Sequence, residues 1–213
     1  HQTLDKLYTK PLGDMLDQVN CLDTSKRNGV FFNSPETTLF LYIDFKSKDS
    51  EMTYRLLMDK YLKPLIDSEY LSFYDTSSDK IVYNQLAIIL TGDYPRELKV
   101  IDNGNGDHGY FYNNKRYAFL DADLLSPETA IPNTSITSSV SFTKLLESCR
   151  SSRIKTLWRG RLIHPEINCM SSHIAENHNR GLKTRIWGVP SWPDRTAKTL
   201  WRQQIFDLHS DLL

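Results

Sequence analysis

Short apolar runs alternate with amphipathic stretches along this chain, and the alternation predicts strands and helices in turn. Residues 38–43 are apolar, β-branched and aromatic, and residues 86–91 form a continuous apolar run of the kind found in buried parallel strands. Further strands are expected at 117–123, 136–142 and 182–188, a hairpin at 71–75 and 80–84, and the start of another strand at 210–213. The chain therefore carries several strands spaced for connection by helices.

Apolar residues three and four positions apart predict the helices. The first covers residues 3–20, where Pro11 kinks or divides it, and its apolar face needs a sheet to cover it. The second opens at Ser50 and ends around Pro64. Three more are expected at 144–149, 166–179 and 194–208, and Gly181 closes the second of these.

Strands separated by helical patterns favour parallel βα units and an α/β fold. A doubly wound nucleotide-binding sheet should show a GxGxxG turn or a P-loop, and the sequence has neither. We therefore expect a TIM-type (β/α) barrel. A complete barrel needs about 250 residues, so the 213 residues predict one incomplete barrel domain, covering residues 1–213 and roughly strands three to eight.

Composition and charge narrow the classes of partner that this chain is expected to bind. The 26 Lys and Arg residues balance the 26 Asp and Glu residues, so the chain has no overall basic field and nucleic acid is disfavoured as a partner. No run approaches the roughly 18 apolar residues that span a bilayer, so we expect a soluble chain without a transmembrane segment. A mitochondrial or secretory address would require a targeting segment upstream of His1. Oligomeric state is not indicated.

Three cysteines, Cys21, Cys149 and Cys169, lack the CxxC spacing of a zinc site and are odd in number. We expect reduced thiols. The alternative is one Cys149–Cys169 bridge in an oxidising compartment.

The strand at 38–43 delivers a carboxylate and an ammonium at its C-terminal end. Asp44 and Lys46 are two residues apart, so in an extended chain they leave the sheet on the same face. In an α/β barrel this end of the strands carries the chemistry. On spacing alone, a surface ion pair at a solvated strand end is the favoured interpretation.

Six motifs in order add a family resemblance. They are TLDKLY at 3–8 with Pro-Leu at 11–12, LYIDFK at 41–46, LTGD at 90–93, FLDA at 119–122, SVSF at 139–142 and RGLKTRIWGVP at 180–190. In this succession the chain resembles the fungal branch of the phosphatidylinositol phospholipase C and glycerophosphodiester phosphodiesterase superfamily. The nearest likeness is to the altered inheritance of mitochondria protein 6 family.

The resemblance implies a phosphoric diester hydrolase of lipid metabolism on a TIM-type barrel, with Mg²⁺ or Ca²⁺ at the strand ends. Its acidic-x-Lys pattern matches Asp44 as a metal ligand and Lys46 as the catalytic cation that faces the phosphate. Trp187, Arg185 and Asp121 match substrate-binding positions at strand ends. The expected partner is a phosphodiester or a small molecule derived from a phospholipid.

The chain departs from that superfamily in one respect. The two histidines that act as general acid and base there, with the other acidic metal ligands, belong to strands upstream of the TLDKLY motif. We therefore expect a fragment that is inactive alone. The alternatives are a non-catalytic barrel used for binding or scaffolding, and a phosphate-binding regulator of lipid metabolism.

The remaining chemistry-bearing residues have plainer interpretations. The histidines at 164, 173, 178 and 209 are expected to be solvated, and His108 lies in a glycine-rich loop whose acidic and amide residues only faintly suggest calcium. Asn133-Thr134-Ser135 is a glycosylation sequon that matters only in a secreted chain.

Overall fold

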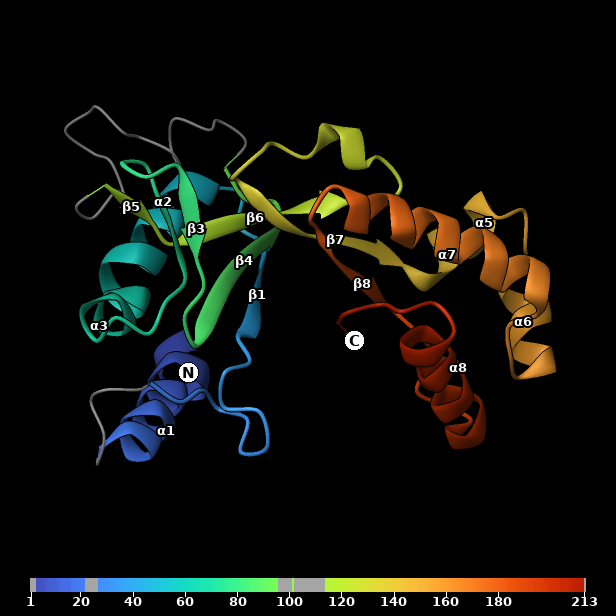
Figure 1. The fold of residues 1–213 in the computed structure, drawn as a ribbon, viewed down its shortest axis with the longest axis horizontal. Coiled ribbons are helices and arrows are strands. Elements are labelled where there is room, and N and C mark those ends of the chain that lie inside the picture. Colours follow the sequence, from blue (N-terminus) through green and yellow to red (C-terminus); the bar gives the residue numbers. More distant parts are fainter. Residues whose placement is uncertain (1–2, 22–26, 96–100, 102–113, 213) are drawn as a thin grey trace. The chain divides into compact units, whose positions relative to one another are not determined.

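The structure is a computed structural model that describes residues 3–21, 27–95, 101 and 114–212. Contacts divide the chain into two compact units, His1–Phe119 and Leu120–Leu213. Figure 1 shows the elements of each unit. His108 and the glycine-rich loop at 102–109 lie outside the described residues.

Unit 1 is built on two parallel strands, β1 (Leu39–Phe45) and β4 (Leu86–Gly92). Their register pairs Asp44 with Thr91 and Phe45 with Gly92, so the two strands end together. The first five residues of β4 are fully buried, which is typical of a parallel strand covered on both faces. The two predicted strands are confirmed, and β1 extends two residues further than its apolar run.

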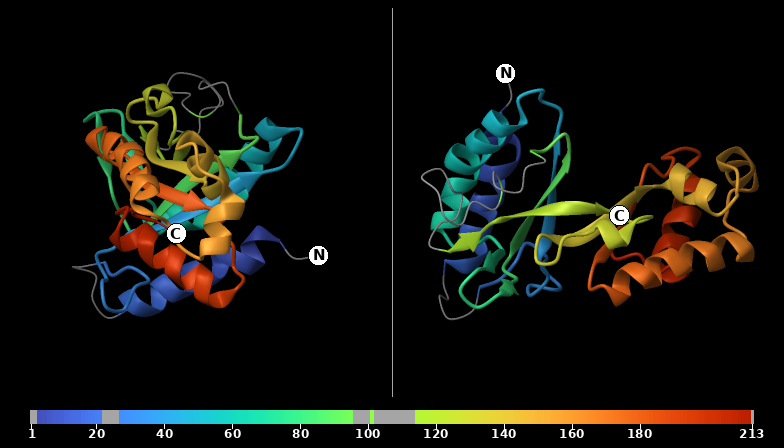
Figure 2. Two further views of the ribbon diagram at one scale, coloured as in Figure 1. Left: turned by 90° about the vertical axis from the view of Figure 1, so that its right-hand side faces the viewer. Right: turned by 90° about the horizontal axis from the view of Figure 1, so that it is seen from above.

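Helical segments cover one face of this strand pair, as Figure 2 shows. They are η1 (Asp5–Thr9), α1 (Lys10–Asn20), α2 (Ser50–Leu56), η2 (Leu57–Leu62) and α3 (Lys63–Asp67), where η1 and η2 are π-helical. Asp49 caps α2 by accepting a hydrogen bond from the backbone N–H of Met52 at 3.0 Å.

The first helix is confirmed, and it belongs to the helical layer on one face of the strand pair. Leu16 is fully buried, whereas Leu7, Tyr8, Met15 and Val19 are exposed, so only part of its apolar face is covered. The helix also packs against α3. A Cβ placed on Gly13 would stand 3.5 Å from Cδ2 of Leu65, so the glycine lets the two helices approach closely.

The second helix does not end around Pro64, which is a correction. The helical path continues to Asp67, because Pro64 occupies the first turn of α3, where its missing N–H would have had no intrahelical partner. The preceding π-helical segment η2 separates it from α2.

The predicted hairpin is confirmed. Strands β2 (Phe73–Asp75) and β3 (Lys80–Val82) pair antiparallel, and β5 (Lys115–Arg116) pairs with the other side of β2. This three-stranded sheet belongs to unit 1.

Unit 2 carries three parallel strands in sequence order. They are β6 (Ala118–Asp123), whose first two residues still belong to unit 1, β7 (Ser135–Ser141) and β8 (Lys183–Trp187). The expected strand at 210–213 is reduced to one parallel bridge between Leu212 and Arg185. The three predicted strands are confirmed.

Helices connect and flank these strands. They are the single turn η3 (Pro127–Thr129) and the helices α5 (Phe142–Ser148), α6 (Arg153–Arg159), α7 (His164–Asn179) and α8 (Asp194–Phe206). Their buried faces meet the strands in one apolar core that includes Phe142, Met170, Ile174, Ile186 and Leu200. Gly181 ends α7 with a φ of +76°, as its C-cap position predicted.

The expectation of reduced thiols is wrong for two of the three cysteines. Cys149 and Cys169 form a disulfide with their Cα atoms 5.8 Å apart, and Cys21 is free and exposed. The pairing depends on helix packing. Cys149 follows the last residue of α5 and Cys169 lies on α7, and these helices pack side by side.

The α/β class with parallel strands is confirmed, and closure into a TIM-type barrel stays a prediction. Within the described ranges, no helix combines the length and the apolar character that crossing a membrane requires.

Candidate functional site

Asp44 and Lys46 form an ion pair at the end of β1. The Nζ atom of Lys46 lies 2.9 Å from Oδ2 of Asp44, and both side chains are more than half exposed. The same-face geometry predicted from the strand period is therefore confirmed. An exposed pair of this kind contributes little to stability, so its interest lies in the charges that it holds at the strand end.

Gly92 shapes the position of the Asp44 carboxylate. Its φ is +77°, and a Cβ built on it would stand 2.2 Å from Oδ1 of Asp44 and 2.5 Å from the carbonyl oxygen of Phe45. Any larger residue would collide with both. The next residue, Asp93, donates its backbone N–H to that same carbonyl oxygen at 2.9 Å, so the ends of β1 and β4 are fastened together.

A shallow depression of about 390 Å³ opens beside this end. The residues that line it carry two ammonium groups, two hydroxyls, a carboxylate and a phenol ring. These belong to Lys46, Ser47, Lys48, Ser50, Asp93 and Tyr94. The cations and hydroxyls suit an anion such as a phosphate group, whereas the carboxylates of Asp93 and of the neighbouring Asp44 suit a cation.

The two carboxylates keep Lys46 charged. The hydrogen bond from its ammonium group to Asp44 raises the pKa of Lys46 above its ordinary value, and the charges of Asp44 and then Asp93 raise that pKa further. Lys46 is therefore a fixed positive charge at neutral pH. It can neutralise a phosphoryl oxygen, but it cannot accept a proton there.

The other predicted site residues lie in unit 2. Oδ1 of Asp121, on β6, accepts hydrogen bonds from the hydroxyls of Thr137 at 3.1 Å and Ser139 at 2.9 Å, both on β7. Arg185, on β8, is the register partner of Ser139, so Asp121 and Arg185 stand on the two strands that flank this serine. The two residues are thus separated by one strand, β7.

Trp187 is the last residue of β8 and pairs in register with Ser141. Its side chain is 49% exposed and lies two residues beyond Arg185, which places both on the same face of β8. The five predicted residues thus fall into two groups, Asp44 with Lys46 in unit 1 and Asp121, Arg185 and Trp187 in unit 2.

The surroundings of Asp44 do not amount to a complete metal centre. Within the described part of the chain, no two further His, Cys, Asp or Glu side chains come close enough to share an ion with it. Mg²⁺ or Ca²⁺ takes six or more oxygen ligands, and Asp44 would offer one side chain toward such a shell.

The prediction of solvated histidines is confirmed for His164, His178 and His209, which are exposed, whereas His173 is half-buried. His178, at the end of α7, lies 2.7 Å from Oδ2 of Asp211, and His173 lies 3.4 Å from the hydroxyl of Ser148. His164 is the first residue of α7. None of the residues lining the depression in unit 1 is a histidine.

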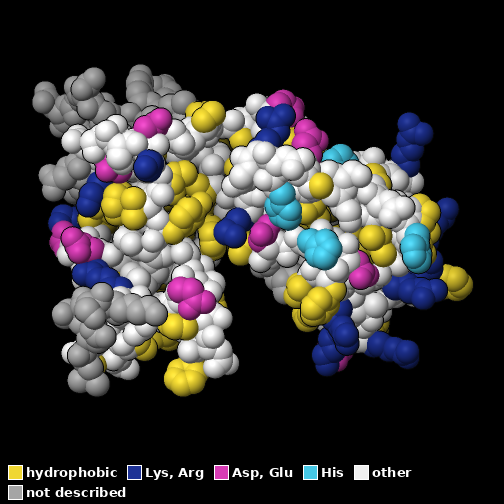
Figure 3. All heavy atoms as spheres, in the orientation of Figure 1, with side chains coloured by type: hydrophobic (Ala, Val, Ile, Leu, Met, Phe, Trp, Pro, Cys, Tyr) yellow, Lys and Arg dark blue, Asp and Glu magenta, His cyan; other side chains and the backbone are white. Residues whose placement is uncertain are grey.

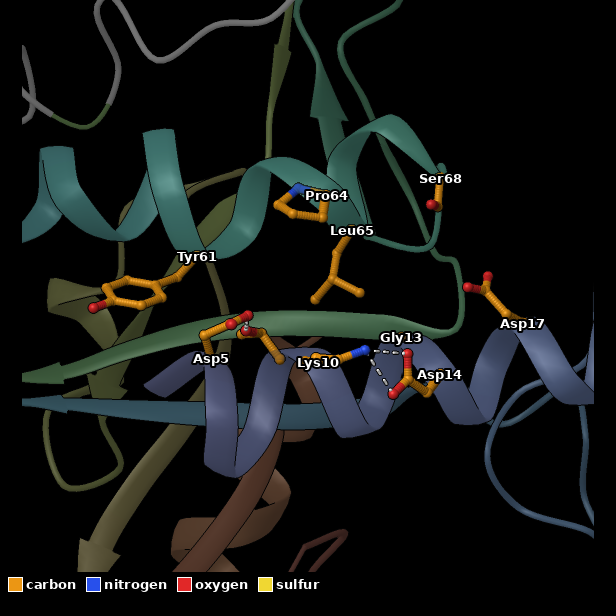
Figure 4. Close-up of a pocket in the computed structure, with 10 residues that line it drawn as sticks. Asp5, Lys10, Gly13, Asp14, Asp17, Tyr61, Pro64, Leu65 and Ser68 are labelled. Atoms are coloured by element: carbon orange, nitrogen blue, oxygen red, sulfur yellow. Dashed lines mark hydrogen bonds and ion pairs between the residues drawn. The ribbon is translucent and has the colours of Figure 1, made fainter. Parts of the chain in front are cut away.

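A second cavity, of about 270 Å³, lies between α1 and the η2–α3 segment (Figure 4). Figure 4 shows Asp5, Asp14 and Asp17 along one wall and Tyr61 and Leu65 on the other. The carboxylates already have partners, because Lys10 contacts Asp14 at 3.0 Å and the hydroxyl of Tyr70 donates to Asp17 at 2.7 Å. This cavity is a gap between two helices and holds no group poised for chemistry.

Sequence reasoning missed that Asp93 and Lys48 line the depression and that Gly92 makes room for the Asp44 carboxylate. A signal existed, because the apolar run at 86–91 stops at Gly92-Asp93, and parallel strands end at the same edge of a sheet. What the sequence did not reveal was that β1 and β4 are immediate neighbours.

Comparison with known proteins identifies a family model that matches part of this chain. A model of the AIM6-like phosphodiesterase domain matches residues 1–113, slightly more than half of the chain. No solved structure shows a significant match.

Curated relatives match over nearly the entire chain. Proteins named "Altered inheritance of mitochondria protein 6" are 52% identical in Zygosaccharomyces rouxii, 54% in Saccharomyces cerevisiae and 45% in Candida glabrata. The match covers 99 to 100% of this chain and 52 to 54% of those three proteins. The chain therefore spans about half the length of the curated relatives it matches, and it belongs to the AIM6-like phosphodiesterase domain family.

Proposed function

We propose that the protein to which this chain belongs hydrolyses phosphodiesters, with a divalent cation and a phospholipid-derived substrate. The observation that carries the proposal is the pairing of a carboxylate and a fixed cation, Asp44 and Lys46, at the shared end of two parallel strands. Family membership supports the same reaction class.

The proposed role of Lys46 is electrostatic. Its ammonium group would face a phosphoryl oxygen and stabilise the negative charge that develops during cleavage. Lys48, which lines the same depression, would add a second positive charge. Ser47 and Ser50 would offer hydroxyl hydrogen bonds to the bound group.

The proposed role of Asp44 is to supply one ligand to Mg²⁺ or Ca²⁺, which would neutralise phosphate charge when bound. The remaining ligands, together with a general acid and base, would come from residues beyond these 213. Asp121, Arg185 and Trp187 would contribute to substrate binding through the polar face of the strands in unit 2, as part of a TIM-type barrel.

The test uses the full-length protein and bis(p-nitrophenyl) phosphate with Mg²⁺ or Ca²⁺. We expect Asp44→Asn and Lys46→Gln each to lower kcat by about 10²–10³-fold, the usual cost of losing one group that stabilises transition-state charge. Asp44→Asn should also raise the Mg²⁺ concentration that gives half-maximal rate.

The matched control is another exposed ion pair of unit 1. Lys63 and Asp67 pair one helical turn apart on α3, away from the strand ends. Lys63→Gln and Asp67→Asn should leave kcat unchanged. Wild-type activity in Asp44→Asn and Lys46→Gln would remove both residues from the site.

A second candidate is a non-catalytic barrel that binds phosphorylated ligands. It is favoured by the absence of histidine, the side chain most often used as a general acid or base, among the residues that line the depression. Under this alternative, the full-length protein would bind inorganic phosphate or a phosphorylated headgroup without turning over any diester, and Lys46→Gln would weaken that binding.

A further inference from the structure

The segment 150–165 concentrates positive charge in a chain whose formal net charge is zero. It contains five cationic side chains and no Asp or Glu. They are Arg150, Arg153, Lys155, Arg159 and Arg161. Figure 3 shows Lys and Arg side chains gathering over the part of unit 2 that carries α6. The sequence pattern alone predicted no element here.

One of these cations has an internal role. The guanidinium of Arg159 is paired with the buried carboxylate of Glu166. Two further residues of α6 face inward: Thr156 is fully buried, and Leu157 packs on the core of unit 2. This side of α6 therefore anchors the helix to the rest of the unit.

The opposite side of α6 presents a large apolar pair to solvent. Ile154 is 80% exposed and Trp158 is 91% exposed. They are four residues apart on the helix, so they lie next to each other on one face. Scattered apolar side chains are normal on a surface, but a nearly bare Trp beside a bare Ile on a short anchored helix forms a continuous apolar ridge.

Cations flank this ridge without partners. At about 100° per residue, Arg153 and Lys155 project to either side of Ile154, and Arg150 and Arg161 lie just beyond the two ends of α6. All four are exposed, and within the described part of the chain their side chains make no hydrogen bond or ion pair. The α6 ridge is thus an apolar pair on a helix that carries two exposed cations and has one more just beyond each end.

We propose that the α6 ridge docks on the surface of a bilayer that contains anionic phospholipids. Trp favours the headgroup level of a membrane, where its ring is half in apolar and half in polar surroundings. Lys and Arg near an anionic surface each add attraction to the phosphates. The apolar pair and the flanking cations are the combination found on helices that lie in the membrane interface.

Charge complementarity favours this occupant over others. A nucleic acid would satisfy the cations but would leave Ile154 without an apolar environment, and a protein partner would need an acidic rim around an apolar pocket. An anionic bilayer offers both environments at once. The α6 ridge shares no residue with the strand-end depression, so it stands or falls independently of the proposed phosphodiesterase activity.

The test is co-sedimentation of the protein with vesicles of phosphatidylcholine, with and without phosphatidylserine. We expect binding only when phosphatidylserine is present, and weaker binding at higher salt. Arg153→Gln and Lys155→Gln should each reduce the partition coefficient about fivefold, and Trp158→Ala about tenfold or more. These side chains are exposed, so far-ultraviolet circular dichroism should show that the variants fold.

Matched controls come from the same unit. Trp192 is 80% exposed and lies outside the segment 150–165. Lys144 is an exposed lysine on α5 and also lies outside that segment. Trp192→Ala and Lys144→Gln should bind vesicles as the wild type does. Fluorescence should shift to the blue on binding in Trp192→Phe and not in Trp158→Phe.

Several outcomes would overturn the proposal. These are equal binding to vesicles with and without phosphatidylserine, equal losses in Trp158→Ala and Trp192→Ala, or binding of RNA but not of vesicles. Lys46→Gln separates the two proposals, because it should lower the rate of diester hydrolysis about 10²–10³-fold and leave vesicle binding intact.

Discussion

Oδ1 of Asp44 lies 2.2 Å from the point where a Cβ on residue 92 would stand, so only glycine at position 92 allows the carboxylate its place. The two residues come from neighbouring parallel strands, β1 and β4, and face each other at the strand ends. The candidate site thus depends on a residue without a side chain.

Gly92→Ala should destabilise the protein by roughly 2–4 kcal/mol. Part of this cost, about 1–2 kcal/mol, comes from placing an L side chain at positive φ, and the rest from displacing Asp44 and the carbonyl group of Phe45. Urea unfolding followed by circular dichroism would measure the change.

The control for Gly92→Ala is Gly181→Ala. Gly181 has a φ of +76°, and nothing lies within 4 Å of the position where its Cβ would stand, so only the backbone cost of about 1–2 kcal/mol should appear. If both variants lose the same free energy of unfolding, then a Cβ at residue 92 does not collide with Asp44 or the Phe45 carbonyl group, and the strand-end geometry is wrong.

Glu166→Gln should destabilise unit 2 by about 2–4 kcal/mol. The Glu166 side chain is only 4% exposed. Its carboxylate accepts hydrogen bonds from the side chains of Ser151, Thr156 and Arg159 and from the backbone N–H of Ile163. Burial alone would raise the pKa of Glu166, but these hydrogen bonds outweigh it and lower the pKa.

The measurement for Glu166→Gln is again denaturant unfolding. Glu147→Gln, on the exposed face of α5, is the matched change and should stay within about 0.5 kcal/mol of the wild type. If Glu166→Gln leaves the free energy of unfolding unchanged, then the carboxylate charge does not hold α6 to the start of α7.

Asp211→Asn should cost about 1–3 kcal/mol at neutral pH. The Asp211 carboxylate accepts the backbone N–H of Thr184 at 2.8 Å and its hydroxyl at 3.0 Å, and it pairs with His178, which ties the C-terminal segment to β8. Burial alone would raise the pKa of the Asp211 carboxyl, but these contacts outweigh burial and lower that pKa below its ordinary value.

The lowered pKa gives the Asp211 contribution a defined pH dependence. It is fully present above the unfolded pKa of about 4 and is lost as pH falls through the lower folded pKa. The stability difference between wild type and Asp211→Asn should therefore shrink below about pH 4. A stability difference that stays constant down to acid denaturation would contradict this prediction. The control is Asp207→Asn, which changes an exposed carboxylate.

Disulfide mapping should find one reactive thiol before reduction and three after it. Cys21 is free and exposed, whereas Cys149 and Cys169 are joined. The bridge closes a loop with a sequence separation of 20 residues, for which the chain-entropy estimate is roughly 3 kcal/mol. Maleimide labelling with mass spectrometry checks the count, and three reactive thiols without reduction would refute the pairing.

Much of the fold could be predicted because strand periodicity is local. The period of two placed Asp44 and Lys46 on one face, and the continuous apolar run at 86–91 marked β4 as buried. The helix of residues 3–20 was found from its spacing, but its packing against α3 was not, because an apolar face does not specify whether a sheet, another helix or both will cover it.

Local sequence determined the order of the main strands, the order of every long helix, and the pairing of the acid and the amine at the end of β1, since all of these follow from spacings of a few residues. Only the tertiary structure decided that Gly92 makes room for Asp44, that Cys149 meets Cys169, that Asp211 reaches Thr184 and His178, and that Trp158 is left bare on α6. These features join residues distant in the chain or depend on which helix faces pack, and such proximity is set by the packing of the whole unit.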